Sequence, residues 1–381
     1  MSDSQTKQAP DLGIPASKSC CKVEIIDTTT ILTVPDNFLV EPHIEGKDYL
    51  NLPDYAFLLT SEKGEKVVFD LGTRHDWWNS VPSIAEMCEK HVPGLRVDKD
   101  VTQVLEDGGV KLADLKSLIL SHWHFDHNGN LSSLPTSVDL ITGPGFKDAF
   151  LPGYPAKQES VFWEEDFRER NVIEAPFDMK IGKFDAWDYF SDGSLYVLNV
   201  PGHATAHVSA LVRTTPDTFV FLGGDVCHFT GDIRPSEYIN MPENIPKEGE
   251  ALLDKRFSRP CPCSIFMASH PSHSDSEPFY RCASGSSSFY VDPPTAQNSI
   301  RTLIGFDANP NVCTLIAHDP APLKVMPFFP NGTINDWKEK DFKRQMHWDF
   351  LNEIPAKGVP GKDPLVDGLY RKGKKVRGLE V

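Results

Sequence analysis

The stretch 121-SHWHFDHNGN-130 constrains this chain more than any other part of its sequence, because three histidines and an aspartate directly follow the apolar run 117–120. These residues form the pattern H-x-H-x-D-H and are His122, His124, Asp126 and His127. Alternate side chains of an extended strand point to the same side, so the first two imidazoles can bind one ion. A tight bend at Gly129 then redirects the other two side chains toward a second position. Four such residues after a strand seldom serve packing alone, so the pattern predicts a metal site rather than a histidine-rich surface turn.

Three later apolar runs also end in a residue that can bind a metal. These residues are His203 in 200-VPGHATAH-207, Asp225 in 222-LGGDV-226 and His318 in 315-LIAHD-319. Because the loops after these strands are expected to emerge at one sheet edge, all of these side chains should lie together. Imidazole and carboxylate groups in this number are enough for a two-metal site in which Asp225 bridges both ions. These donors suit zinc or another borderline divalent metal.

Strand-like runs recur along the chain, and helical patterns lie between some of them. The strand-like runs are 23–34, 55–60, 66–72, 117–121, 138–143, 195–202, 207–214, 218–225 and 312–319. The helical patterns are at about 80–91, 100–107, 294–307 and 336–352. Strands mixed with helices predict an α+β fold in which helices cover sheet layers.

The sequence predicts one large domain, over residues 20–354, with irregular additions. Residues 1–19 are polar, which predicts a flexible N-terminal tail. Within the domain, about 230–293 is predicted to be a loop-rich insertion, and we expect it to cover the mouth of the site. Residues 355–381 are basic and rich in Gly and Pro, which predicts a C-terminal surface extension rather than a second domain.

The charge and the cysteine content of the chain limit its partners and its compartment. A formal net charge of −16 repels nucleic-acid phosphates and anionic membranes, so neither is expected as a partner. The expected partner is a small-molecule substrate, and a homodimer is compatible with the sequence. The N-terminus carries neither a signal nor a transit pattern, and no apolar run is long enough to predict a transmembrane helix. Eight cysteines among 381 residues make no disulfide framework, which predicts a cytoplasmic protein with mostly reduced thiols.

The motifs and their order resemble those of the metallo-β-lactamase superfamily over roughly residues 23–320. The H-x-H-x-D-H motif, a P-G-H, a G-D after an apolar strand and a final histidine follow one another as in that family. The resemblance implies a four-layer αβ/βα sandwich with the metal site at one edge of the two sheets. The fragment H-F-D-H-N-G and the second histidine of 201-PGHATAH-207 look most like the N-acyl-homoserine-lactone lactonases. A related branch opens small cyclic lactams and carbamates.

By this resemblance the chain is expected to be a dinuclear zinc hydrolase that resembles lactonases and lactamases. Two Zn²⁺ ions per chain are implied, with Mn, Fe or Co as alternatives. The first metal would be held by His122, His124 and His203, the second by Asp126, His127 and His318, with Asp225 shared between them. The resemblance further implies that a metal-bridging hydroxide attacks the carbonyl of a lactone, γ-lactam or cyclic carbamate. Asp126 would also pass a proton to the leaving group.

Four more residues are expected near the ligands. Asp70 in 66-KVVFDLG-72 resembles the family's aspartate that supports the site from beneath, and His207 is expected to pack or hydrogen-bond behind the ligands. Phe125, inside the motif, is predicted to line the substrate pocket. Where the lactonases carry a tyrosine three residues after the bridging aspartate, this chain has His228. We predict that His228 is catalytic, is not required as a ligand, and donates a hydrogen bond to the developing oxyanion.

Two other functions stay open, a thioesterase of the glyoxalase II type and a mono-iron persulfide dioxygenase. The thioesterase needs basic residues for glutathione, and no basic patch accompanies the motifs. The dioxygenase uses fewer of these ligands. A separate zinc site is a further alternative, formed by Cys261, Cys263, Cys282, His270 and His273. Because C-P-C lacks the paired C-x-x-C spacing of structural zinc, reduced loop cysteines are the favoured interpretation.

Overall fold

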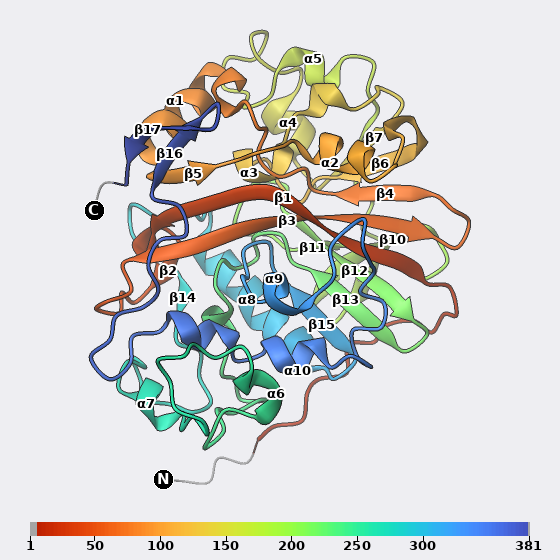
Figure 1. Ribbon diagram of the computed structural model, residues 1–381. Coiled ribbons are helices and arrows are strands. Elements are labelled where there is room, and N and C mark those ends of the chain that lie inside the picture. Colours follow the sequence, from red (N-terminus) through yellow and green to blue (C-terminus); the bar gives the residue numbers. More distant parts are fainter. Residues whose placement is uncertain (1–5, 380–381) are drawn as a thin grey trace.

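Two mixed β-sheets pack face to face in the computed structural model, which describes residues 6–379 (Figure 1). Within these residues the sheets have nine strands, in the order β17-β16-β5-β1-β3-β4-β6-β7-β8, and six strands, in the order β15-β13-β12-β11-β10-β9. The first sheet comprises β1 (Cys21–Pro35), β3 (Tyr49–Ser61), β4 (Lys66–Phe69), β5 (Gly94–Arg96), β6 (Leu115–Ile119), β7 (Asp139–Thr142), β8 (Val172–Glu174), β16 (Gly368–Arg371) and β17 (Lys374–Gly378). The second comprises β9 (Met179–Ile181), β10 (Phe184–Asp188), β11 (Leu195–Asn199), β12 (Val208–Thr215), β13 (Thr218–Leu222) and β15 (Val312–Leu315). A short pair is formed by β2 (Val40–Glu41) and β14 (Arg281–Cys282).

Helices cover the outer faces of both sheets (Figure 1). The α-helices are α1 (Pro82–His91), α2 (Val101–Asp107), α3 (Phe125–Asn128), α4 (Phe146–Phe150), α5 (Glu164–Phe167), α6 (Lys247–Glu250), α7 (Ser264–Met267), α8 (Pro293–Ala308), α9 (Pro322–Val325) and α10 (Phe342–Met346). Leu118 and Leu140 of the first sheet pack beneath α2 and α4, while α8 packs on the second sheet through Leu303 and Phe306.

Alternating apolar side chains on the long strands explain the layers. Inner-face residues of the first sheet, such as Ile25 and Phe57, pack against Val197 and Val212 of the second, and this core is buried from water. Burial of such apolar area is the main favourable term in folding, at about 25 cal/mol per Å². The predicted α+β fold, a four-layer sandwich of two sheets between helices, is confirmed.

The predicted helix over 336–352 is wrong as a single element. Asp341 adopts a positive φ of 59°, a left-handed conformation that interrupts a helix. Only α10 and a 3-10 turn at Asp349–Glu353 form, and Trp337 and Phe342 are buried in the core between the sheets. The other three helical patterns correspond to α1, α2 and α8. No helix formed by residues 6–379 is both long and apolar enough to span a membrane.

The predicted flexible tail is packed on the domain over its described part, which corrects that expectation. Leu12 is only 4% exposed and packs in the apolar core beneath α8. The backbone N–H of Gly182 donates to the Leu12 carbonyl at 2.6 Å, and the Arg213 guanidinium donates to the Pro15 carbonyl at 2.5 Å. Burial of the apolar Leu12 side chain stabilises the packed position of this segment, although the residues around it are mostly polar. Residues 1–5 lie outside the described residues.

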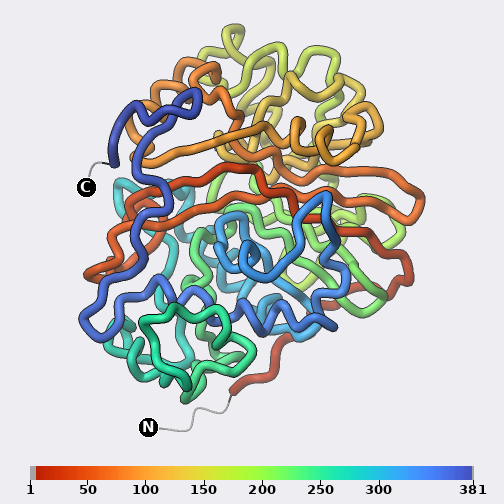
Figure 2. Tube along the Cα trace, viewed as in Figure 1, coloured from red at the N-terminus to blue at the C-terminus, as the bar shows by residue number. Residues whose placement is uncertain are grey.

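The loop-rich segment 230–293 contains little regular structure but contributes to an apolar core. Its buried side chains, among them Phe257 and Phe266, join a cluster with Leu351 from the C-terminal part of the chain. Figure 2 shows this green-to-cyan segment beside the blue C-terminal segment. The C-terminal extension, described as far as residue 379, adds β16 and β17 to the edge of the first sheet next to β5.

Candidate metal centre

The seven predicted ligands meet at one edge of the two sheets, in loops that follow β6, β11, β13 and β15. The strands β11, β13 and β15 run in the same direction, so their carboxyl ends share this edge. The end of β6 joins them from the first sheet, because the backbone N–H of Val208 donates to the Ser121 carbonyl at 2.8 Å. Six of the seven side chains are buried and His124 is half-buried. The fold thus brings together all the ligands that the sequence indicated.

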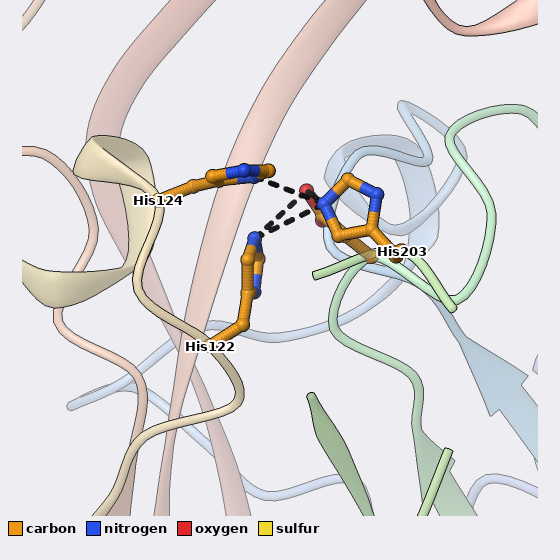
Figure 3. Close-up of side chains that lie close together, drawn as sticks. His122, His124 and His203 are labelled. Carbon is orange, nitrogen blue, oxygen red and sulfur yellow. Dashed lines mark hydrogen bonds and ion pairs between the residues drawn. The ribbon is translucent and has the colours of Figure 1, made fainter. Parts of the chain in front are cut away.

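Three histidines form the first group of ligand atoms. Nε2 of His203 lies 3.2 Å from Nε2 of His122 and 2.9 Å from Nδ1 of His124. Figure 3 shows the three side chains pointing toward one another, with His122 and His124 on one loop and His203 on another. Three ring nitrogens that face one common point are the arrangement that a single divalent ion requires.

The second group consists of Asp126, His127 and His318, and Asp225 stands between the groups. Oδ1 of Asp225 lies 3.1 Å from Nε2 of both His127 and His318. Its other oxygen, Oδ2, lies 3.5 Å from Nε2 of His122 and 3.4 Å from Nε2 of His203. Each carboxylate oxygen therefore faces a different group, as a carboxylate shared by two ions would.

The donor atoms of these groups fit divalent metals. Nε2 of His127, Nε2 of His318 and Oδ1 of Asp225 are buried without a hydrogen-bond partner among the described residues. Buried polar atoms are almost always satisfied, so three orphaned atoms aimed at one point indicate a missing ligand. His122, His124, His203 and Oδ2 of Asp225 fit one ion, and Asp126, His127, His318 and Oδ1 of Asp225 fit a second.

Burial keeps the first group in the protonation state that a metal needs. It lowers the pKa of His124 to about 4 and holds the pKa of His122 and His203 well below the usual range. These imidazoles are neutral near pH 7 without an ion. In the second group burial also lowers the pKa of His318, but the Asp225 carboxylate more than offsets this and the pKa rises to about 9. A metal must therefore displace a proton from the second group.

Neighbouring groups fix the orientation of the ligands. Nδ1 of His127 donates to Oδ2 of Asp70 at 2.9 Å, while the backbone N–H of Ser121 donates to Oδ1 of Asp70 at 2.7 Å. His207 is not a ligand in this arrangement, because its Nδ1 donates to the Val200 carbonyl at 2.8 Å and its Nε2 accepts from the backbone N–H of Asp225 at 3.1 Å. Such contacts set which ring nitrogen is free to bind a metal.

Two supporting groups were missed by the sequence analysis. Nδ1 of His318 donates to the Pro53 carbonyl at 2.9 Å, a backbone contact that no motif signals. The next residue, Asp54, is buried in β3 and accepts a hydrogen bond from the Thr28 hydroxyl at 3.1 Å. Burial raises the pKa of Asp54 well above its usual range. Its only signal in the sequence was a lone aspartate inside an apolar strand.

A cavity of about 500 Å³ opens over the ligands. Its walls are mostly apolar and include Leu32, Val34, Ile84, Met87, Phe125 and Phe289, and no lysine or arginine from residues 6–379 lines it. Phe125 lies where a pocket residue was predicted. The segment 230–293 contributes only residues 288–291, so most of the expected cover lies elsewhere and other walls come from β1 and α1. The volume suits a small molecule.

His228 also lines this cavity and is 3% exposed. Its Nε2 lies 3.0 Å from Oδ2 of Asp225, and its Nδ1 lies 2.8 Å from the hydroxyl of Tyr290. Tyr290 was not predicted, because it is 62 residues away in the sequence and no local motif announces it. The alternative zinc site finds no counterpart, since every candidate metal group among the described residues lies at this centre. All eight cysteines are free, as expected.

This αβ/βα sandwich with clustered histidine and aspartate ligands at its sheet edge defines a class of metal-dependent hydrolases. The sequence pattern of the metallo-β-lactamase superfamily matches residues 52–237. The chain is 37% identical over 391 residues to the γ-lactamase FDB1 of Fusarium pseudograminearum, an alignment that covers 99% of this chain and 91% of that protein. The chain therefore belongs to the metallo-β-lactamase superfamily and is a hydrolase of that family.

Another relative is the metallo-hydrolase mfmC of Annulohypoxylon moriforme, 38% identical over 359 residues that cover 92% of each protein. Among solved structures, the fold is similar to that of a B. thuringiensis AiiA mutant with N-decanoyl-L-homoserine bound at the active site. The TM-score is 0.53 at 16% identity, with 84% of this chain and all of that chain covered. At this identity the similarity concerns the fold alone.

Proposed function

We propose that the chain uses two divalent metals, with zinc as the expected pair, to open a small cyclic ester or amide. The substrate would be a lactone, a γ-lactam or a cyclic carbamate, and the proposed compartment is the cytoplasm. The observation that carries the proposal is the placement of Asp225, whose two oxygens face two different groups of histidines. A relative that spans nearly the whole chain is named a γ-lactamase, which supports the amide end of this range.

The bound metals would supply a hydroxide nucleophile and polarise the carbonyl oxygen of the substrate. The residues of the chain do the rest. Asp126 lines the cavity and lies in the second ligand group, so its carboxylate is placed to pass a proton to the leaving oxygen or nitrogen. His228 lies beside Asp225 at the cavity wall, where an N–H can stabilise the oxyanion that forms on ring opening.

The cavity argues against the thioesterase alternative. Glutathione carries carboxylates, and its recognition calls for cationic side chains near the site. Among the residues that line the cavity there is no lysine or arginine. An uncharged substrate with an apolar body fits these walls better, because burying an unpaired carboxylate there is costly. The dioxygenase alternative needs fewer ligands than the seven that converge here.

The deciding experiment is a ring-opening screen of the purified, metal-loaded protein over lactones, γ-lactams and cyclic carbamates. We expect turnover of at least one class, with hydrolysis lost in the metal-free protein and restored by adding Zn²⁺. A glutathione thioester and a persulfide with oxygen are assayed in parallel. One iron per chain with oxygen uptake, or thioester cleavage without ring opening, would overturn the proposal.

A further inference from the structure

We propose that Tyr290 is a positioning residue that orients the ring of His228, so that its Nε2–H group stays at the wall of the reaction cavity. The inference rests on the proposed function for its catalytic consequence, but its structural part stands separately. The hydroxyl of Tyr290 lies 2.8 Å from Nδ1 of His228, and Nε2 of the same ring lies 3.0 Å from Oδ2 of Asp225. Tyr290, His228 and Asp225 therefore form one continuous chain of contacts.

When the imidazole of His228 is neutral, the hydrogen-bonding capacity of the three groups allows one pattern. A carboxylate can only accept, so the contact with Oδ2 of Asp225 requires a proton on Nε2 of His228. A neutral imidazole then has a lone pair on Nδ1, which must accept. The hydroxyl of Tyr290 is the group that donates to it. This assignment follows from the network of contacts rather than from visible hydrogens.

Tyr290 is held firmly enough to orient the His228 ring. It is 4% exposed, and its ring packs edge-on against His203 with ring centroids 5.0 Å apart. The backbone N–H of Tyr290 donates to the Ser288 hydroxyl at 3.0 Å, and the next residue, Val291, donates its N–H to the His203 carbonyl at 2.9 Å. The end of the 230–293 segment is thereby pinned to the loop that carries a ligand of the first metal group.

The consequence concerns turnover more than binding. His228 and Tyr290 both line the cavity, so the Nε2–H group lies between the shared carboxylate and the space for a substrate. Without the Tyr290 hydroxyl, Nδ1 loses its partner, and the ring keeps one contact instead of two to hold the Nε2–H group toward the oxyanion. Removing an oxyanion donor outright costs on the order of 10²-fold in kcat or more. We expect the loss of the group that orients it to cost less, on the order of tenfold.

The test compares Tyr290→Phe with Tyr280→Phe in the Zn²⁺-loaded protein. Tyr280 is a matched control, since it is buried in the same segment, lies outside the cavity wall and has a hydroxyl without a hydrogen-bond partner among the described residues. Histidine-selective ¹⁵N NMR reports which ring nitrogen of His228 carries the proton and whether the other nitrogen accepts a hydrogen bond, with its signals assigned from His228→Gln. Metal content and thermal unfolding are measured for every variant.

In the native protein and in Tyr280→Phe we expect Nε2 of His228 to be protonated and Nδ1 to accept. Tyr290→Phe should keep both metals and a similar KM, lose about tenfold in kcat, and shift the Nδ1 signal of His228 to that of a nitrogen without a hydrogen bond. An unchanged Nδ1 signal in Tyr290→Phe would overturn the proposal, even if kcat falls. So would a spectrum of the native protein in which Nε2 binds the metal and Nδ1 is protonated. Failure of the proposed function is seen separately, as no ring opening by the native protein, and leaves the NMR result on the hydrogen bond of Nδ1 standing.

Discussion

Replacing Asp70 by Asn should weaken the second metal site without disturbing the first. Asp70 accepts two hydrogen bonds, from the Ser121 backbone N–H on one oxygen and from Nδ1 of His127 on the other. It also adopts a positive φ of 61°, a conformation that Asn tolerates and most residues do not. The substitution therefore keeps size and backbone and changes only one acceptor into a donor.

The single oxygen of Asn cannot accept both hydrogen bonds. If it stays with Ser121, its NH₂ group faces Nδ1 of His127 and favours the tautomer with the proton on Nε2, the atom aimed at the second metal position. If it turns to His127, the buried N–H of Ser121 is left opposite a donor, which costs about 1–3 kcal/mol. Loss of such a supporting contact typically lowers metal affinity 10- to 100-fold, or about 1.4–2.8 kcal/mol.

Competition with a chromophoric chelator measures both affinities. In Asp70→Asn we expect the affinity of the second site for its ion to fall about 10- to 100-fold. The affinity of the site formed by His122, His124 and His203 should change little. Asp98→Asn is the control, because Asp98 is exposed and its carboxylate forms an ion pair with Arg96, far from the motif residues in the sequence. Two unchanged dissociation constants in Asp70→Asn would refute the reasoning that Asp70 sets the tautomer of His127.

Three further outcomes are expected. Asp225→Ala should retain at most one metal by elemental analysis, and two tightly held metals would contradict a shared carboxylate. Affinity for the second metal should fall as pH drops below about 9, because the pKa of His318 is raised to about 9 and its proton must be displaced. The first site should weaken only as pH approaches 4, the pKa of His124. Calorimetric titration with Zn²⁺ across this range measures both affinities, and equal pH dependence at the two sites would contradict the expectation. Leu12→Ala should lower the free energy of unfolding by about 2–5 kcal/mol in denaturant titration, and a value near zero would show that the segment is not part of the core.

The metal ligands could be predicted from the sequence because each follows an apolar strand within a short motif. The period of a strand places His122 and His124 on the same side, and Asp225 follows the end of the apolar strand β13 in the second sheet. Local patterns therefore predict both the residue type and its position. Tyr290 and the Pro53 carbonyl could not be found in this way. Their contacts join segments 62 and 265 residues apart, and nothing in the flanking residues records the partner. The burial of Leu12 could not be predicted either, because the segment 1–19 was judged by its overall polar composition, which does not reveal one apolar side chain that packs in the core.

The metal ligands lie in local motifs, whereas the residues that shape the substrate cavity come from segments far apart in the sequence. The reacting groups stand on loops at one edge of two packed sheets, where Asp225 joins both ligand groups and its own backbone is held by His207. The cavity walls instead come from β1, α1 and residues 288–291, which are ordinary apolar positions in segments far apart along the chain. Exchanging a wall residue such as Met87 changes the shape and polarity of the cavity without touching a ligand atom. Substrate preference should therefore be adjustable by substitutions that leave metal binding intact, whereas changes around Asp225 should alter both together.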